Sequence, residues 1–489
     1  MQISNPQPER HSSHFQNQQG KTDFDGKQPP KLLTKSETGF ACRARALACI
    51  RILVFGLIAF TVWNEDIASS VLLGESFRFP MGVMTPLRNI SESLGQPLDN
   101  VAVLRSLKFA TLALSLMACA GVFRSLTLPL STLCYLVFAG ILREHSHLFH
   151  SGLLPLYLAA ALSLMPCADA ISLDRLRGAT EPSRSKEFYG WCRFACWAMI
   201  AIVYFGAGYS KLTNGGLMWW SGDNLRQIVL TDCMNPMMFD WDWGIKFKDM
   251  PTELFAGMGL SALLIETFYP LVLFNRLARV VFPLGAIGMH LGIFFFQNIL
   301  FLDLILLQLL FVNWDWVVGK LLREQQNEPT VDGDDNSKIA AQATFALIFF
   351  LLLMVVAKIE YYPLTSWQMY SGKGRGDYAV YFRCEEHLSS GLKQRANFEK
   401  AFPVLRDTRY RDILLHTISS EPERLREFTR RYIQISNADP IHGNKIEKVV
   451  LQRRSWSIDK LATDYDADTL IDEVVVTAPA NQSAQPSPQ

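Results

Sequence analysis

The sequence has almost no net charge, and this removes one class of partner from consideration. Its 47 lysines and arginines nearly balance its 46 aspartates and glutamates, which leaves +1 at pH 7. A chain balanced in this way gives no reason to expect a nucleic acid as a partner. The nine cysteines include no Cys-x-x-Cys pair, which argues against a thiol–disulfide oxidoreductase. No internal repeat relates the two halves, which argues against the common transporter folds.

The N-terminal segment lacks the features of a cleavable signal peptide, because the first apolar run begins too far into the chain. Residues 1–44 are rich in Gln, Asn, Ser, Lys and Pro, and we expect them to form a disordered tail in the cytoplasm. The composition of residues 476–489 also predicts disorder.

Long apolar runs fill the middle of the chain, which is 49% hydrophobic. Several runs approach the roughly 20 residues that a helix needs to cross a bilayer. We therefore expect an all-α integral membrane protein with about nine spans in residues 45–357. The expected spans are Leu47–Val62, Val103–Phe123, Leu126–Leu142, Gly152–Ala170, Tyr189–Tyr209, Glu253–Phe274, Arg279–Phe296, Ile299–Val318 and Ala340–Ala357.

Basic residues predict the orientation of these spans. They cluster before the first span, between the fourth and fifth, between the sixth and seventh, and after the eighth. With an odd number of spans all four clusters lie on one side, and the positive-inside rule makes that side cytoplasmic. We therefore predict an inner-membrane protein with its N-terminus in the cytoplasm and its C-terminus outside.

Residues 358–475 are predicted to form a small extra-cytoplasmic α+β region. The run from Asp377 alternates like a strand, and Ile446–Trp456 is a second strand candidate. Ser420 and Glu423 have the spacing of a capping box before an amphipathic helix. Cys233 and Cys384 both fall on the predicted outer side, where a disulfide between them and two free thiols are both open interpretations.

Ionisable residues recur inside or beside the apolar runs, where they are costly. Such groups face the interior of a helix bundle and pair with one another. A structural network and a functional cavity are both open interpretations for any one of them, but their recurrence on different spans favours a cavity. The residues are His145, His147, His150, Lys211, Glu266, His290 and Asp303. Among them, His147, Glu266, His290 and Asp303 are the candidates for a proton relay or the cavity wall. No set of these residues predicts a metal site.

Lys211 is the most informative of these residues, because it ends the otherwise apolar run VYFGAGYSKL. Desolvation favours the neutral amine of a lysine. A neutral amine at physiological pH is a competent general base. Four tryptophans follow in the next loop, and their simplest interpretation is an interfacial aromatic belt. They are Trp219, Trp220, Trp241 and Trp243.

Two segments resemble the vitamin K-dependent γ-glutamyl carboxylases and their bacterial relatives, the horizontally transferred transmembrane (HTTM) proteins. VYFGAGYSKL followed by Trp219, Trp220 and Gly222 is similar to the family's lysine segment. EHSHLFHSGLL is similar to its histidine segment, and GMH around His290 to another histidine. The resemblance covers roughly residues 45–320.

The resemblance implies an enzyme that oxidises reduced vitamin K, or another quinol, with O₂ and uses the resulting base to carboxylate a glutamate side chain with CO₂. Lys211 matches the base that acts on the quinol, and His145 matches a histidine that positions the reacting species. Tyr204, Trp219 and Trp220 are then expected to contact the cofactor. A protein or peptide would be the substrate, and the lipid bilayer would surround the enzyme.

The sequence also departs from the animal enzymes. Ser210 stands where they have a second lysine, and only about 130 residues follow the last span, too few for their large outer region. A non-enzymatic membrane subunit of the same family, acting in peptide or toxin maturation or export, is therefore the main alternative. A proton channel and a bundle with His145 and His290 as haem ligands are the others.

Overall fold

A computed structural model of the protein describes residues 40–145, 150, 152–178, 184–235, 241, 243–321, 336–369, 371–372, 378–406, 409–417, 420–438, 444–457 and 468–478. Residues 39–489 form one compact unit. His147 and nearly all of both predicted disordered tails lie outside the described residues.

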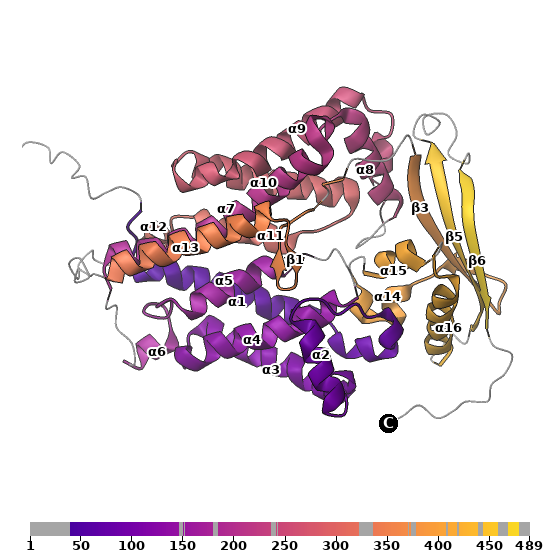
Figure 1. Ribbon diagram of the computed structural model, residues 1–489, viewed down its shortest axis with the longest axis horizontal. Helices are drawn as coiled ribbons and strands as arrows, with labels where there is room; N and C mark the ends of the chain where they lie inside the picture. The colour runs from indigo at the N-terminus through magenta and orange to yellow at the C-terminus, as the bar shows by residue number, and fades with distance from the viewer. Residues whose placement is uncertain are drawn as a thin grey trace, which may run out of the picture. The chain divides into compact units, whose positions relative to one another are not determined.

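Among the described residues, seven helices are long and apolar enough to cross a membrane (Figure 1). This confirms the prediction of a mostly helical chain with several apolar spans. The helices are α1 (Ala44–Asn64), α3 (Val101–Ala120), α4 (Arg124–Arg143), α7 (Lys186–Gly215), α9 (Thr252–Phe268, continued by the 3₁₀ helix η7, Tyr269–Leu273), α10 (Ala278–Gln297) and α13 (Asn336–Val356).

Two of the expected spans are not long continuous helices. The fourth contains only α5 (Leu153–Ser163), because the next turn approaches Pro166 and a residue before proline is biased away from helical geometry. The eighth is divided into α11 (Leu302–Leu307) with η8 (Gln308–Phe311), and α12 (Trp314–Leu321), which meet at 78°. The break lies at Val312, which is extended, and Asn313 caps the new helix through the backbone N–H of Trp316.

Successive apolar segments run in opposite directions through the bundle. The starts of α1 and α7 are joined by the hydrogen bond from Cys42 N to Lys186 O, and the starts of α7 and α13 by the hydroxyls of Ser185 and Ser337. We call this the arginine end. It holds Arg43, Arg45, Arg193, Arg276 and Arg279.

The opposite end, where α1, α7 and α13 finish, we call the sheet end. Lys358 after α13 donates to Asn214 of α7 there. Helix α3 runs back toward the start of α1. Its end lies there, where Arg51 of α1 donates to the carbonyl of Cys119. The alternation follows the order of the expected spans, including the two that are interrupted.

The C-terminal region is a sheet packed on short helices. Its antiparallel strands follow the order β4 (Lys393–Arg395), β3 (Tyr378–Leu388), β5 (Ile446–Ser457) and β6 (Thr469–Thr477). The helices are α14 (Phe398–Ala401), α15 (Arg409–Thr417) and α16 (Pro422–Ala438). Strands β3 and β5 and helix α16 confirm the three elements expected here. The apolar face of α16 buries Leu425, Phe428 and Ile433.

The C-terminal region contacts both halves of the bundle at the sheet end. Arg409, which is fully buried, pairs with Glu65 just after α1 at 2.7 Å. Nearby, Val404 N donates to the hydroxyl of Ser69. On the other side, Asn235 at the end of α8 (Gly222–Met234) exchanges hydrogen bonds with the backbone of β3.

Helix α8 carries Cys233, one of the two cysteines for which the sequence left a disulfide open. All nine cysteines of the chain are described, and each is a free thiol. Cys233 on α8 is buried against Gly244, and Cys384 on β3 pairs in register with Leu451 of β5. The two thiols therefore lie on neighbouring elements as packing groups, without the disulfide that the sequence left open.

Candidate functional site

A buried ion pair joins α7 to α9 near the sheet end. Nζ of Lys211 lies 2.9 Å from Oε1 and 2.8 Å from Oε2 of Glu266. Lys211 is 4% exposed and Glu266 6%. The amine also donates to the carbonyl of Met369 at 3.1 Å and lies 5.1 Å from the ring centre of Trp219. Lys211 therefore has a carboxylate, a carbonyl and an aromatic face as partners.

Glycine at position 208 lets the two helices approach closely enough for this pair to form. A methyl group on Gly208 would lie 2.7 Å from the backbone nitrogen of Thr267, so only glycine fits between the helices. One turn further along α7, the lysine side chain reaches across to the preceding residue of α9. In the motif GAGYSK, the glycine lets α7 approach α9 closely, and the lysine one turn later is close enough to pair with Glu266.

A cavity of about 660 Å³ opens beside the ion pair. Its wall combines Lys211, Trp219 and Glu266 with apolar side chains and glycines of α8, α9 and α10. Methyl groups added to Gly257, Gly288 or Gly292 would meet no atom within 4 Å, so these positions leave room in the cavity wall. A space of this size, apolar with few polar groups, is typical of a site for a small lipophilic molecule.

Gln297 at the end of α10 supplies a further polar group to the cavity wall. Its side chain is 7% exposed, and its Oε1 atom has no hydrogen-bond partner among the described residues. A buried acceptor without a donor is costly and is usually satisfied by a ligand or water. The cavity therefore has an ion pair and an unsatisfied amide oxygen in its wall, which also includes the exposed Glu253 and Ser261 among mainly apolar residues.

A second polar cluster, distinct from the ion pair, joins α7, η7, α10 and η8. Gln308 of η8 donates to the hydroxyl of Tyr204 at 2.9 Å, and this hydroxyl forms a hydrogen bond of 2.8 Å with Nε2 of His290. Tyr269 donates to the amide oxygen of the same glutamine. The rings of Tyr204 and Tyr269 stack with centres 4.3 Å apart.

The carboxylate of Asp303 binds backbone N–H groups. Its carboxylate accepts from the N–H of Gly152, at the start of α5, and from that of Leu304. It therefore ties the short helix α5 to α11. No hydrogen bond among the described residues connects Asp303, His290 and Glu266, so these three candidates for a proton relay occupy three separate clusters.

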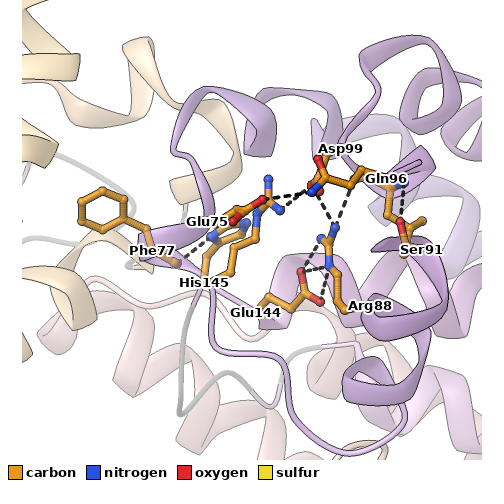
Figure 2. A network of polar contacts seen from close by, with 10 residues as sticks. Glu75, Phe77, Arg88, Ser91, Gln96, Asp99, Glu144 and His145 are labelled. Carbon is orange, nitrogen blue, oxygen red and sulfur yellow. Dashed lines mark hydrogen bonds and ion pairs between the residues drawn. The ribbon is translucent and has the colours of Figure 1, made fainter. Parts of the chain in front are cut away.

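His145 lies in a different polar network at the sheet end, shown in Figure 2. It is fully buried, and its Nδ1–H donates to the carbonyl of Phe77 at 3.1 Å. Burial lowers the pKa of His145 to about 3; the bond to Phe77 opposes this shift, and the charge of Arg78 adds to it. His145 is therefore a neutral imidazole. Its Nε2 has no partner among the described residues.

The residues around His145 form a buried ion-pair cluster. Arg88 of α2 (Met84–Ser93) binds both oxygens of Glu144 through Nε, at 2.9 and 3.1 Å, and it also binds Asp99 at 3.0 Å. Arg78 pairs with the same aspartate. Figure 2 shows these groups pointing toward one another beside the imidazole. This arrangement holds the loop after α4 against α2.

The structure therefore separates the two residues that the resemblance implied as catalytic. Lys211 lines the cavity, whereas His145 does not contribute to its wall. Trp219 is buried against the lysine, while Trp220 is 37% exposed and lies outside the cavity wall. Tyr204 belongs to the second polar cluster and does not line the cavity.

The remaining candidates have structural surroundings. His150 contacts the hydroxyl of Thr365 at 3.3 Å and packs near the ring of Trp367. Trp241 and Trp243 pack on phenylalanines at the end of α10, an arrangement compatible with the expected aromatic belt. Among the described residues, no group of three or more His, Cys, Asp or Glu side chains could hold a metal ion.

Sequence reasoning missed several groups that complete the site. Gln297 and Gln308 are uncharged amides inside apolar runs, and their polarity there was a signal that could have identified them. The carbonyl of Met369 could not be found in this way, since any residue supplies a carbonyl. Comparisons with protein-family models, with curated proteins and with solved structures find no match for this chain.

Proposed function

We propose that the chain is a multi-pass protein of a bacterial cytoplasmic membrane, with the arginine end in the cytoplasm. The seven long apolar helices support this proposal, and several of them carry large exposed apolar side chains. The clustering of arginines at one end of the bundle favours this orientation. The C-terminal sheet region would then lie outside the cytoplasm.

We propose further that it is an enzyme of the vitamin K-dependent carboxylase type, in the HTTM family. The observation that carries this proposal is the Lys211–Glu266 pair at the wall of a large apolar cavity. A quinol bound there, on oxidation by O₂, would supply the strong base that removes a γ-proton from a glutamate side chain before CO₂ adds. The acceptor would be a glutamate-containing peptide or protein.

The residues of the cavity fit a quinol head group. A quinol has two hydroxyl groups, and the buried acceptors of the wall include the Lys211–Glu266 pair and the free amide oxygen of Gln297. The glycines of α9 and α10 leave open space for a ring and tail. The apolar walls match a lipophilic molecule that enters from the bilayer.

Lys211 and Glu266 would act as one proton-accepting unit. The lysine amine contacts the carboxylate of Glu266, the carbonyl of Met369 and the ring face of Trp219. The amine becomes a base when its proton passes to Glu266, which leaves two neutral groups in a low-dielectric site. Lys211 can then accept the proton of a ligand hydroxyl.

The test is formation of vitamin K epoxide in membranes supplied with reduced vitamin K, O₂, CO₂ and a glutamate-containing peptide. We expect epoxide from the wild-type protein, and a loss of more than about 100-fold in Lys211→Ala, which is the usual size of a general-base effect. Lys358→Ala is the matched control, because this exposed lysine bonds Asn214 outside the cavity. It should retain full activity.

A second variant separates loss of the cavity from loss of the base. Gly288→Phe places a ring into open space in the cavity wall, and it raises helix propensity at that position. We expect a folded protein that makes no epoxide. Epoxide formation unchanged in both Gly288→Phe and Lys211→Ala would refute the assignment of this cavity.

The position of His145 favours a second candidate function, a non-enzymatic membrane subunit that acts in peptide or toxin maturation or export. The histidine is enclosed in an ion-pair cluster away from the cavity, so the two implied catalytic residues do not meet there. Under this alternative, well-folded wild-type protein makes no epoxide with any quinol. Lys211→Ala would then keep the cellular phenotype wherever it keeps the protein level.

A further inference from the structure

The cavity proposed to hold the quinol opens sideways between α9 and α10. Its rim includes Gly257 and Ser261 on α9 and Gly288 on α10, and all three are exposed. Both helices are long and apolar enough to cross a membrane. Ser261 lies nine residues, or about 14 Å of helix, from Thr252 at the start of α9. In a membrane-spanning α9 this opening therefore lies at the depth of the lipid hydrocarbon chains.

The gap between the two helices widens from one point of contact. At Gly285 a methyl group would lie 3.2 Å from Cδ1 of Ile265, so the helices touch there. One and two turns further along α10, at Gly288 and Gly292, a methyl group would meet no described atom within 4 Å. Gly257 on the facing helix is equally open. The gap is therefore a wedge that is closed at Gly285 and open beyond it.

Large apolar side chains flank this gap on the outward surface of both helices. On α9, Leu260 is 37% exposed and Leu264 is 46% exposed, and neither lines the cavity. On α10, Leu284 is 62% exposed and Leu291 is 39% exposed, and neither lines it either. Small residues thus replace leucines where the cavity meets the outward surface, which leaves space for a hydrocarbon chain to pass between the helices.

Polar groups inside the cavity indicate that its ligand also has a polar head. The buried Oε1 atom of Gln297 has no hydrogen-bond partner among the described residues. Oε2 of Glu266 is also buried, and its 2.8 Å contact with Nζ of Lys211 is an ion pair without the geometry of a hydrogen bond. Buried acceptors of this kind are usually satisfied by a ligand or by water. A molecule that fits both the wall and the gap has a hydrogen-bond donor at its head and an apolar tail.

We propose that the gap between α9 and α10 is a lateral entrance, through which the head of a long-tailed lipophile reaches the Lys211–Glu266 pair while its tail stays in the bilayer. A tail that remains in hydrocarbon has no burial free energy to lose or gain, so only the head group has to move into the protein. The inference rests on the proposed function for the identity of the head, a quinol. The entrance itself requires only the cavity and the gap.

The entrance is tested in phosphatidylcholine vesicles that contain a phosphatidylcholine with a diazirine on its acyl chain. Illumination makes the chain label the residues that it touches, and mass spectrometry of peptides locates the label. We expect label on Met289 in the cavity wall and on Leu284 outside it. Ser261→Phe fills the rim, so it should lower the label on Met289 at least about fivefold and leave Leu284 unchanged.

Leu264→Phe is the matched control, because this exposed leucine of α9 lies outside the cavity wall. It should leave the label on both residues unchanged. Gly288→Leu narrows the gap from the other helix and should act like Ser261→Phe, so the test does not depend on the folding of one variant. Wild-type protein labelled on Leu284 but not on Met289 would overturn the proposal. Label on Met289 that is equal in wild type and both rim variants would also overturn it.

Two probes with the same ring test where the tail lies. Menadione has no tail and menaquinone-4 has an isoprenoid tail, and native mass spectrometry in detergent measures the binding of each. Ser261→Phe should weaken menaquinone-4 binding at least about tenfold, because the new ring occupies the path of the tail, and should change menadione binding less than about threefold. Equal effects on the two probes, or unchanged binding of menaquinone-4, would overturn the position of the tail. If neither probe binds the wild type while Met289 is still labelled by lipid, the proposed function fails and the lateral entrance is supported.

Discussion

Replacing Glu266 by glutamine removes the carboxylate partner of Lys211 at a site where both side chains are almost completely buried. The ammonium would keep the carbonyl of Met369 and the ring of Trp219, and the new amide oxygen could still accept a hydrogen bond. Its charge, however, would have no counter-ion. Breaking a buried pair from one side typically costs about 3–5 kcal/mol, because the remaining charge is left uncompensated.

The size of the effect depends on which partner is removed. Glu266→Gln should lie near the lower end, about 3 kcal/mol, because three acceptors remain around the amine. Lys211→Met should lie near the upper end, about 5 kcal/mol, since it leaves a buried carboxylate without its cation. The double variant Lys211→Met with Glu266→Leu removes both charges and should fall within about 1 kcal/mol of the wild type or be more stable.

Thermal unfolding of the detergent-solubilised protein, followed by circular dichroism, measures these differences. Glu427→Gln is the control. It breaks the surface pair with Arg431, whose side chains are 41% and 37% exposed, and it should cost no more than about 0.5 kcal/mol. Single variants as stable as this control would show that water reaches the Lys211–Glu266 pair, which would refute the reasoning. A stable but inactive double variant would show that the pair serves chemistry.

Four other variants test separate parts of the structure. Arg409→Ala should cost about 3–5 kcal/mol in thermal unfolding, because it leaves Glu65 buried and unpaired. The folded-state pKa of His145 lies near 3 and its ordinary value is 6.5, so its contribution to stability is complete above pH 6.5 and is lost as pH falls toward 3. His145→Gln should remove this loss, worth up to about 1.4 kcal/mol per pH unit, in unfolding measured from pH 7 to 4. Gly82→Ala should prevent stable folding, because at φ +62° its methyl would overlap a backbone carbonyl 1.8 Å away. Gly95→Ala, at φ +84° in open space, should cost only about 1–2 kcal/mol in the same assay.

Apolar length predicted most of the helical bundle from the sequence. Each of the seven long helices overlaps one of the expected spans, because a run of about 20 apolar residues has few other stable conformations. The sequence did not predict the interruptions in the fourth and eighth expected spans, because each interruption depends on single residues. Asn313 caps a new helix after one extended residue, and Pro166 lies within the turn that follows α5.

The C-terminal region shows where pattern reasoning works and where it fails. The alternation from Asp377 predicted β3, Ile446–Trp456 was the candidate for β5, and the spacing of Ser420 and Glu423 predicted the helix that begins at Pro422. Strand β6, Thr469–Thr477, was not predicted. Its place is set by pairing with β5, where Val474 lies opposite Leu451. Pairing between distant segments leaves no local signal.

The sequence predicted individual residues of the candidate site but did not predict how they are arranged. Lys211 and Glu266 stood out because ionisable groups in apolar runs are costly. Their pairing depends on the close approach at Gly208, and the third partner is a backbone carbonyl 158 residues from the lysine. The separation of His145 from the cavity follows from the docking of α2 through Arg88 and Glu144, which no spacing in the sequence encodes.

The pairing of Glu65 with Arg409 has a consequence for biosynthesis. The two residues are 344 positions apart. Helix α1 is synthesised early, but Glu65 at its end gains its partner Arg409 only when most of the chain has been made. Contacts of such high sequence separation form late and slowly. While synthesis continues, Glu65 stays hydrated and the sheet end stays open. If synthesis stops before residue 409, the released chain lacks the Arg409–Glu65 contact. Its incompletely packed bundle is then a substrate for quality-control proteases.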